Sequence, residues 1–204
     1  MKCTKLGNSD ITVSQFAVGC MSFGVPFPDT MQWTLNEKES EAMVKQALDL
    51  GINFFDTSNN YARGTSEEFL GKAVRNLTTR DKVVIASKVH NNPGKLSREA
   101  ILREIDGTLK RLGTDYLDLY IIHRFDYGTP MEETMETLHS LVQAGKVRAL
   151  GASAMYGYQF MNLQLIAEKN GWTKFVSMQN HYNLIYREDE RELIPVCKQW
   201  GVSL

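Results

Sequence analysis

Three apolar segments of the chain each end in a residue that can take part in acid–base chemistry. Asp56, Lys88 and His123 close these segments in that order, and Tyr61 follows Asp56 by five residues. Aspartate is unfavourable in a half-buried strand, so Asp56 needs a partner, and the ammonium group of Lys88 could provide one. The pattern predicts a site in which a carboxylate holds a lysine beside a tyrosine hydroxyl.

Such a site suits the reduction of a carbonyl group, which needs a hydride at carbon and a proton at oxygen. A phenol is a weak acid at neutral pH, so a cation must favour proton loss from Tyr61. Lys88 can provide that charge while Asp56 keeps the ammonium charged and oriented. His123 would hold the carbonyl oxygen by a hydrogen bond. Each residue alone could have a structural role on the surface or rim, so the prediction depends on their occurring together.

The elements that must position these residues follow from the hydrophobic pattern. Strand-like apolar runs alternate with amphipathic helix-like runs, which predicts parallel βα units. Residues 4–13 have the pattern of a β-hairpin. The expected parallel strands cover residues 15–20, 52–57, 83–89, 117–123, 147–153 and 175–179.

Several helix ends can be recognised from their capping residues. Asn36 with Glu39 three residues later predicts one helix start, and Ser97 predicts another. The apolar residues that would face a sheet from the second helix are Ile101, Ile105, Leu109 and Leu112. Residues 129–132 predict a capping box with proline in the first turn, and Gly145 predicts the end of that helix.

A closed barrel fits these βα units better than an open sheet. Polar residues recur at the predicted strand ends, namely Asp56, Lys88, His123, Ser153 and Gln179. A barrel gathers all of its strand ends around one pocket, whereas an open dinucleotide-binding sheet needs a GxGxxG turn that this sequence lacks. The sequence therefore predicts an α/β fold of the (β/α)8 TIM barrel type.

The chain accounts for about six of the eight βα units of such a barrel, plus the N-terminal hairpin. Residues 201–204 resemble the opening of a seventh strand. We expect residues 1–204 to form a single domain that is an incomplete barrel, with strands seven and eight missing from it. We also expect the native polypeptide to continue for roughly a hundred residues or more.

The composition limits the classes of function. The net charge of −1 gives no electrostatic basis for binding nucleic acid or an anionic membrane. No apolar run approaches the length of a membrane span, and the N-terminus has no apolar signal core. The three cysteines have neither disulfide-framework nor metal-site spacing. We expect a cytoplasmic protein without a metal that could form a homo-oligomer.

Two motifs resemble the signature of the aldo-keto reductase family. They are Gly51-x-x-Phe-Phe-Asp-Thr-x-x-x-Tyr61 and Ser66-Glu-Glu-x-Leu-Gly71, and the other strand-end residues follow in the family's order. The resemblance covers the whole chain, and residues 178–187 are similar to the bacterial branch related to potassium-channel β subunits. It implies a hairpin that closes the bottom of the barrel and a small-molecule carbonyl substrate. It also implies NADPH/NADP+ as cofactor.

The resemblance also implies roles for further residues. Cys20 and Met21 would pass close to the nicotinamide ribose, and Asp56, Ser153 and Gln179 would also contact the cofactor. The family commonly has Asn after the serine of the fifth strand, whereas this chain has Ala154. The cofactor's carboxamide would then depend on Ser153 and Gln179.

The substrate would contact His123 and the loop 23–35. Within that loop Trp33 and Phe27 could form an apolar wall, although both aromatics could equally pack locally. His90 and His181 are expected to be rim or structural residues.

The leading prediction is an NADP-dependent reductase of aldehydes and ketones, with Tyr61 as proton donor and the nicotinamide as hydride source. Three alternatives remain open. Lys88 could instead form a Schiff base in a barrel lyase. The protein could also be a cofactor-binding sensor or scaffold with little turnover, or an inactive truncated remnant.

Overall fold

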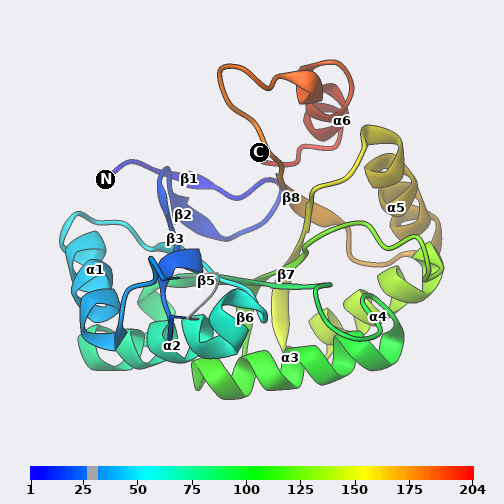
Figure 1. The fold of residues 1–204 in the computed structure, drawn as a ribbon. Helices are drawn as coiled ribbons and strands as arrows, with labels where there is room; N and C mark the ends of the chain where they lie inside the picture. Colours follow the sequence, from blue (N-terminus) through cyan, green and yellow to red (C-terminus); the bar gives the residue numbers. More distant parts are fainter. Residues whose placement is uncertain (27–31) are drawn as a thin grey trace.

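The computed structural model describes residues 1–26 and 32–204, and Phe27 lies outside these ranges. Its centre is a parallel sheet whose strands are hydrogen-bonded in chain order, from β3 to β8. The sheet curls into an open part of a barrel, with the helices along its convex side (Figure 1). The strands are β3 (Ala17–Gly19), β4 (Phe54–Asp56), β5 (Val84–Val89), β6 (Leu117–Ile122), β7 (Val147–Ser153) and β8 (Phe175–Gln179). The predicted incomplete (β/α)8 barrel is confirmed.

Helices follow the strands, as the alternating pattern predicted. They are α1 (Glu37–Asp49), α2 (Thr65–Leu77), α3 (Arg98–Leu112), α4 (Met131–Gln143), α5 (Gly157–Asn170) and α6 (Leu193–Gln199). The predicted capping box of Asn36 and Glu39 forms at α1, and the Ser97 side chain accepts a hydrogen bond from the backbone N–H of Ala100 at α3. On α3, Ile101 and Ile105 are buried in the core.

The predicted capping box at 129–132 is wrong. Pro130 is the N-cap of α4, and no side chain caps that helix start. The Thr129 hydroxyl instead donates to Asp126 Oδ2 at 2.7 Å, because Asp126 organises the turn before the helix and also accepts from the Gly128 N–H. Gly145 has φ of 73°, and it ends α4 as predicted.

Alternation along the strands separates two apolar layers. On β6, Tyr120 and Ile122 pack in the larger cluster with residues of the helices, while Leu119 and Ile121 face the concave side. On β5, Val84 and Ala86 belong to the concave layer. Lys88 is two residues beyond Ala86, so the same period of two directs its side chain to the concave side.

The N-terminal hairpin lies against this concave layer. Its strands β1 (Cys3–Lys5) and β2 (Thr12–Ser14) are antiparallel, and Leu6, Ile11 and Val13 pack with the inward residues near the starts of the strands. The hairpin therefore closes the end of the barrel opposite the predicted site, as the resemblance implied.

The last residues pair with the sheet. Ser203 forms a parallel bridge to Ser177, and its N–H donates to Val176 O at 3.0 Å while its carbonyl accepts from Met178 N at 2.8 Å. Residues 201–204 thus continue the parallel arrangement beyond β8. Within the two described ranges, no helix is long and apolar enough to cross a membrane.

Candidate active site

The ammonium group of Lys88 lies at the centre of the predicted constellation. Its side chain is only 1% exposed, and Nζ lies 2.7 Å from Asp56 Oδ1 and 2.8 Å from Oδ2. The same nitrogen donates to Thr57 O at 2.8 Å and to Tyr61 Oη at 3.3 Å. An ammonium has three N–H groups, so the carboxylate, the carbonyl and the hydroxyl together fix its orientation.

Tyr61 reaches Lys88 through an unusual turn. It begins a short 3₁₀ segment (η2, Tyr61–Gly64) in which Ala62 and Arg63 have φ of 45° and 55°. Non-glycine residues rarely adopt this left-handed conformation, which costs about 1–3 kcal/mol each. Because Lys88 donates to Tyr61 Oη, the phenolic proton remains available, and it has no hydrogen-bond acceptor among the described residues.

His123 faces the tyrosine. The two rings meet edge to face with their centroids 5.8 Å apart. Burial lowers the pKa of His123 from 6.5 to about 4, and the charges of Lys88, Arg124 and His90 act in the same direction. The imidazole is therefore neutral at physiological pH, when a neutral ring can donate one hydrogen bond to a carbonyl oxygen.

The loop that carries Tyr61 is held by an asparagine that the sequence analysis did not single out. Asn59 Nδ2 donates to Asn92 Oδ1 at 3.1 Å and to Glu104 Oε2 at 2.9 Å, and its backbone N–H donates to Lys88 O. These contacts join the loops after β4 and β5 to α3. The run Ser58-Asn59-Asn60 at a strand end was the sequence signal, since such residues bind local backbone and side-chain groups.

The residues expected to bind the nicotinamide lie at the ends of β7 and β8. Gln179 Nε2 donates to Asp56 Oδ2 at 3.2 Å, which joins this residue to the catalytic candidates. The Ser153 hydroxyl donates to Gln179 O at 2.6 Å. Ala154 has φ of 48°, and its N–H donates to Asn180 Oδ1 at 2.7 Å. Asn180 is a further residue that the sequence analysis did not single out. Its side chain holds the turn at Ala154, the position where the family commonly has Asn.

The other residues predicted to contact cofactor or substrate are Cys20, Met21 and Trp33. Cys20 is fully buried, and its carbonyl accepts from Ser66 Oγ. Burial, together with the charge of Asp56, raises the pKa of its thiol. Met21 and Trp33 are 46% and 53% exposed. Within the described residues, no hydrogen bond or ring contact joins Trp33 to the four catalytic candidates.

The second signature motif has mainly structural contacts. Ser66 Oγ lies 2.8 Å from Thr57 Oγ1. Glu67 is fully buried and accepts from Arg111 Nε at 2.6 Å and from Ser87 Oγ. These contacts lie beneath β4 and β5 and support the residues at their ends.

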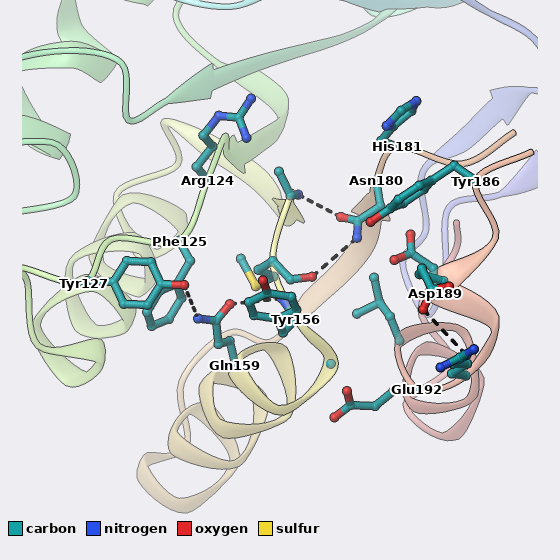
Figure 2. Close-up of a pocket in the computed structure, with 16 residues that line it drawn as sticks. Arg124, Phe125, Tyr127, Tyr156, Gln159, Asn180, His181, Tyr186, Asp189 and Glu192 are labelled. Carbon is teal, nitrogen blue, oxygen red and sulfur yellow. Dashed lines mark hydrogen bonds and ion pairs between the residues drawn. The ribbon is translucent and has the colours of Figure 1, made fainter.

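Two cavities border this region. One, of about 510 Å³, lies on the concave side, and its lining includes Asp56 and Gln179. The other, of about 600 Å³, lies between the loops after β6, β7 and β8, where the Asn180 amide accepts from the Ala154 N–H and donates to Met155 O in the loop after β7 (Figure 2). Arg124, Tyr156 and Tyr186 line the second cavity (Figure 2). Among the described residues, no group of three or more His, Cys, Asp or Glu could hold a metal ion.

The geometry disfavours Lys88 as a Schiff-base nucleophile. Such a lysine must be neutral to attack a carbonyl carbon. Here Nζ is paired with both oxygens of Asp56 and donates to two further oxygens. The contacts favour a charged lysine that acts on its neighbours.

Comparison with known proteins identifies a family model that matches most of the chain, and several similar relatives. The model of the aldo/keto reductase family matches residues 17–204. The chain is 45% identical to the aldo-keto reductase AMT2 of Alternaria alternata, covering 98% of this chain and 62% of that protein. It is 42% identical to the versiconal hemiacetal acetate reductase of Aspergillus parasiticus, covering 100% of this chain and 66% of that protein. A third relative, the aldo-keto reductase dtxS3 of Metarhizium robertsii, is 41% identical, with 98% and 61% covered.

The chain thus spans less than two thirds of the length of these curated relatives. All three organisms are fungi, and none of these matches supports the predicted relation to the bacterial branch.

Proposed function

Because the chain belongs to the aldo/keto reductase family, we propose that it carries the catalytic residues of an NADP-dependent oxidoreductase that reduces aldehydes and ketones to alcohols. The contact that supports this most directly is the Lys88 ammonium, which touches both Asp56 and the Tyr61 hydroxyl. A cation held beside a phenol by a buried carboxylate is what proton donation from that phenol requires.

In this proposal Tyr61 gives its proton to the substrate oxygen as negative charge develops there. The Lys88 ammonium then stabilises the phenolate that remains, at 3.3 Å from Oη. Asp56 does not exchange protons with substrate, and it keeps the ammonium in place. His123 donates a hydrogen bond to the same substrate oxygen and orients the carbonyl.

The residues at the ends of β7 and β8 fit a nicotinamide carboxamide. The Gln179 side chain is exposed and has both a donor and an acceptor, and the Ser153 hydroxyl can accept from an amide. We propose that these two residues hold the carboxamide beside Asp56, with Cys20 and Met21 near the adjoining ribose. When bound, the cofactor supplies the hydride.

The substrate class is proposed from the site and the relatives. One relative is named for the reduction of versiconal hemiacetal acetate, so hemiacetals and simple aldehydes are the first compounds to assay. Trp33 is proposed to contact the substrate, because it is half exposed in the loop before α1. The cytoplasmic location, a homo-oligomer and the relation to the potassium-channel β subunits stay predictions.

Replacing Tyr61 by phenylalanine tests the proposed acid. Tyr61→Phe keeps the ring and removes only the hydroxyl, so we expect kcat to fall by about 10²–10⁴ while the dissociation constant for NADPH hardly changes. Tyr158→Phe is the matched control, because Tyr158 is an exposed tyrosine of α5. Turnover is followed by NADPH consumption with an aldehyde substrate, in the longer polypeptide that the sequence analysis predicts.

Wild-type turnover in Tyr61→Phe would exclude the acid role. Tight NADPH binding with negligible turnover in the unmodified protein would instead favour the sensor or scaffold alternative.

A further inference from the structure

A chain of hydrogen-bonding groups connects two histidines through one asparagine. Asn91 Oδ1 lies 3.1 Å from His90 Nδ1, and Asn91 Nδ2 lies 3.4 Å from His123 Nδ1. The other ring nitrogen of His123, Nε2, has no hydrogen-bond partner among the described residues. The asparagine thus contacts the nitrogen that would face away from a substrate bound at Nε2.

The two ring nitrogens of a neutral imidazole have opposite roles, and a contact at one decides the role of the other. A substrate carbonyl oxygen can only accept, so His123 must carry its proton on Nε2 to bind it. We propose that Asn91 is a positioning residue whose amide N–H donates to Nδ1 and thereby holds His123 in the Nε2–H tautomer. His90 would fix the amide orientation by donating from Nδ1 to Asn91 Oδ1.

Ser58 provides the competing arrangement. Its hydroxyl oxygen lies 3.3 Å from His123 Nδ1, and the Ser58 O–H donates to Asn60 Oδ1 at 2.7 Å. A proton on Nδ1 could therefore donate to Ser58. That tautomer would place an N–H of the ring opposite the N–H2 of Asn91, and Nε2 could then only accept. The Asn91 contact is satisfied only when Nδ1 is the acceptor.

The loop after β5 is built so that Asn91 reaches this position. His90 has φ of 150°, a value that residues with a side chain rarely adopt. The neighbouring Asn92 holds this conformation, because its Oδ1 accepts from the His90 N–H at 3.1 Å and from Asn59 Nδ2. The strained backbone is thus fixed by the same contacts that connect the loops of Lys88 and Tyr61.

Three variants separate the possibilities. Asn91→Asp replaces the donor by an acceptor of the same shape, so His123 should move its proton to Nδ1. Asn91→Leu removes the contact, and Ser58→Ala removes the competing acceptor. The tautomer is read directly from the two nitrogen chemical shifts of His123 in ¹⁵N-labelled protein.

We expect the Nε2–H tautomer in the unmodified protein and in Ser58→Ala, and the Nδ1–H tautomer in Asn91→Asp. A proton on Nδ1 in the unmodified protein would overturn the inference. So would an unchanged tautomer in Asn91→Asp, because Asn91 would then not control it. Loss of Nε2–H in Ser58→Ala would assign control to Ser58 instead.

The inference rests on the proposed reductase function, and kinetics distinguish the two. Asn91→Asp should lower kcat by about 10², the usual effect of losing one donor to a developing oxyanion. Acid should then restore turnover in this variant alone, because an imidazolium beside Asp carries a proton on Nε2 again. The charged and titratable groups facing His123 are Lys88, Arg124 and His90, and all three are present in the unmodified protein and in the variant.

If Tyr61→Phe abolishes turnover while Asn91→Asp retains it at every pH, the reductase function stands and the role of Asn91 does not. If the unmodified protein reduces no carbonyl, the nitrogen shifts still decide the tautomer.

Discussion

At the scale of single residues, Lys88 organises the site. All of its acceptors lie in the segment 56–61, so one ammonium holds the end of β4, the loop behind it and the Tyr61 hydroxyl. The same contacts that orient the proposed proton donor therefore contribute to folding. His123 differs, because its contribution depends on remaining uncharged.

The Asp56–Lys88 pair should be energetically coupled. Lys88→Met leaves a carboxylate that is 14% exposed without its cation, which typically costs about 3–5 kcal/mol. The Asp56→Asn/Lys88→Met double variant should lose clearly less than the sum of the single losses, as measured by urea unfolding. The exposed pair Lys45–Asp49 is the control, and its coupling should be about 0.3–0.5 kcal/mol. Additive losses at Asp56 and Lys88 would show that the buried pair is not coupled.

His123 should make stability depend on pH. Its pKa is lowered from 6.5 to about 4 in the folded protein, so between these values the unfolded chain binds more protons. This contribution is complete above pH 6.5 and is lost as the pH falls toward 4. We expect His123→Phe to lose less stability than the unmodified protein between pH 7 and pH 5, compared by urea unfolding. Equal losses in both proteins would mean that His123 is not held neutral by the fold.

At the scale of elements, the close approach of α2 to α3 supports the strand ends above them. A Cβ at Gly71 would lie 2.2 Å from the backbone oxygen of Leu112, so these helices meet where α2 has no side chain. Glu67 and Arg111 join the same two helices by a buried ion pair. The signature residues of α2 therefore fix a helix contact rather than contact substrate.

Two glycine substitutions test this contact. Gly71→Ala should destabilise the protein by about 1–3 kcal/mol, because the new methyl meets backbone that cannot move without separating the helices. Gly107→Ala is the matched change on α3, where the methyl would meet only the Arg111 side chain, 2.9 Å from Nη1, and no backbone. It should cost clearly less than Gly71→Ala, because a side chain can shift by a few tenths of an ångström and alanine has the higher helix propensity. The free energy of unfolding measures both, and equal effects would contradict the close-contact explanation.

At the scale of the whole molecule, the six parallel strands do not close. Among the described residues β3 pairs only with β4, and β8 pairs beyond β7 only through the single bridge at Ser203. The cavity of about 510 Å³ on the concave side opens between these edges, and its lining includes Leu119, Ile121 and Leu204. Unpaired strand edges and open apolar surface favour association.

The isolated polypeptide of residues 1–204 should therefore bind the apolar dye ANS, self-associate in sedimentation experiments, and bind NADPH weakly. The double variant Leu184→Ser/Ile185→Ser is the control, because these side chains are 93% and 96% exposed in the loop before α6. It removes a second apolar surface without changing the cavity, so dye binding should persist. A monodisperse monomer that binds NADPH with micromolar affinity would contradict this expectation.

The sequence determined the order and type of the parallel strands, because the period of the apolar residues and the polar residue at each strand end are local features. Strands β7 and β8 match their predicted bounds, and the helix starts at Asn36 and Ser97 were recognised from their own caps. The pairing of Asp56 with Lys88, expected from their positions at the ends of two apolar segments, also forms. The capping box at 129–132 was wrong, because Asp126 offered the Thr129 hydroxyl a better acceptor.

Only the tertiary structure decided how the loops meet. Asn59, Asn91 and Asn180 each connect segments that are far apart in sequence, and nothing in their local pattern specifies those partners. The lowered pKa of His123 likewise comes from burial and from charges on other elements. Contacts of this kind depend on where several strand ends come together in space. The spacing of apolar residues within one segment carries no information about that arrangement.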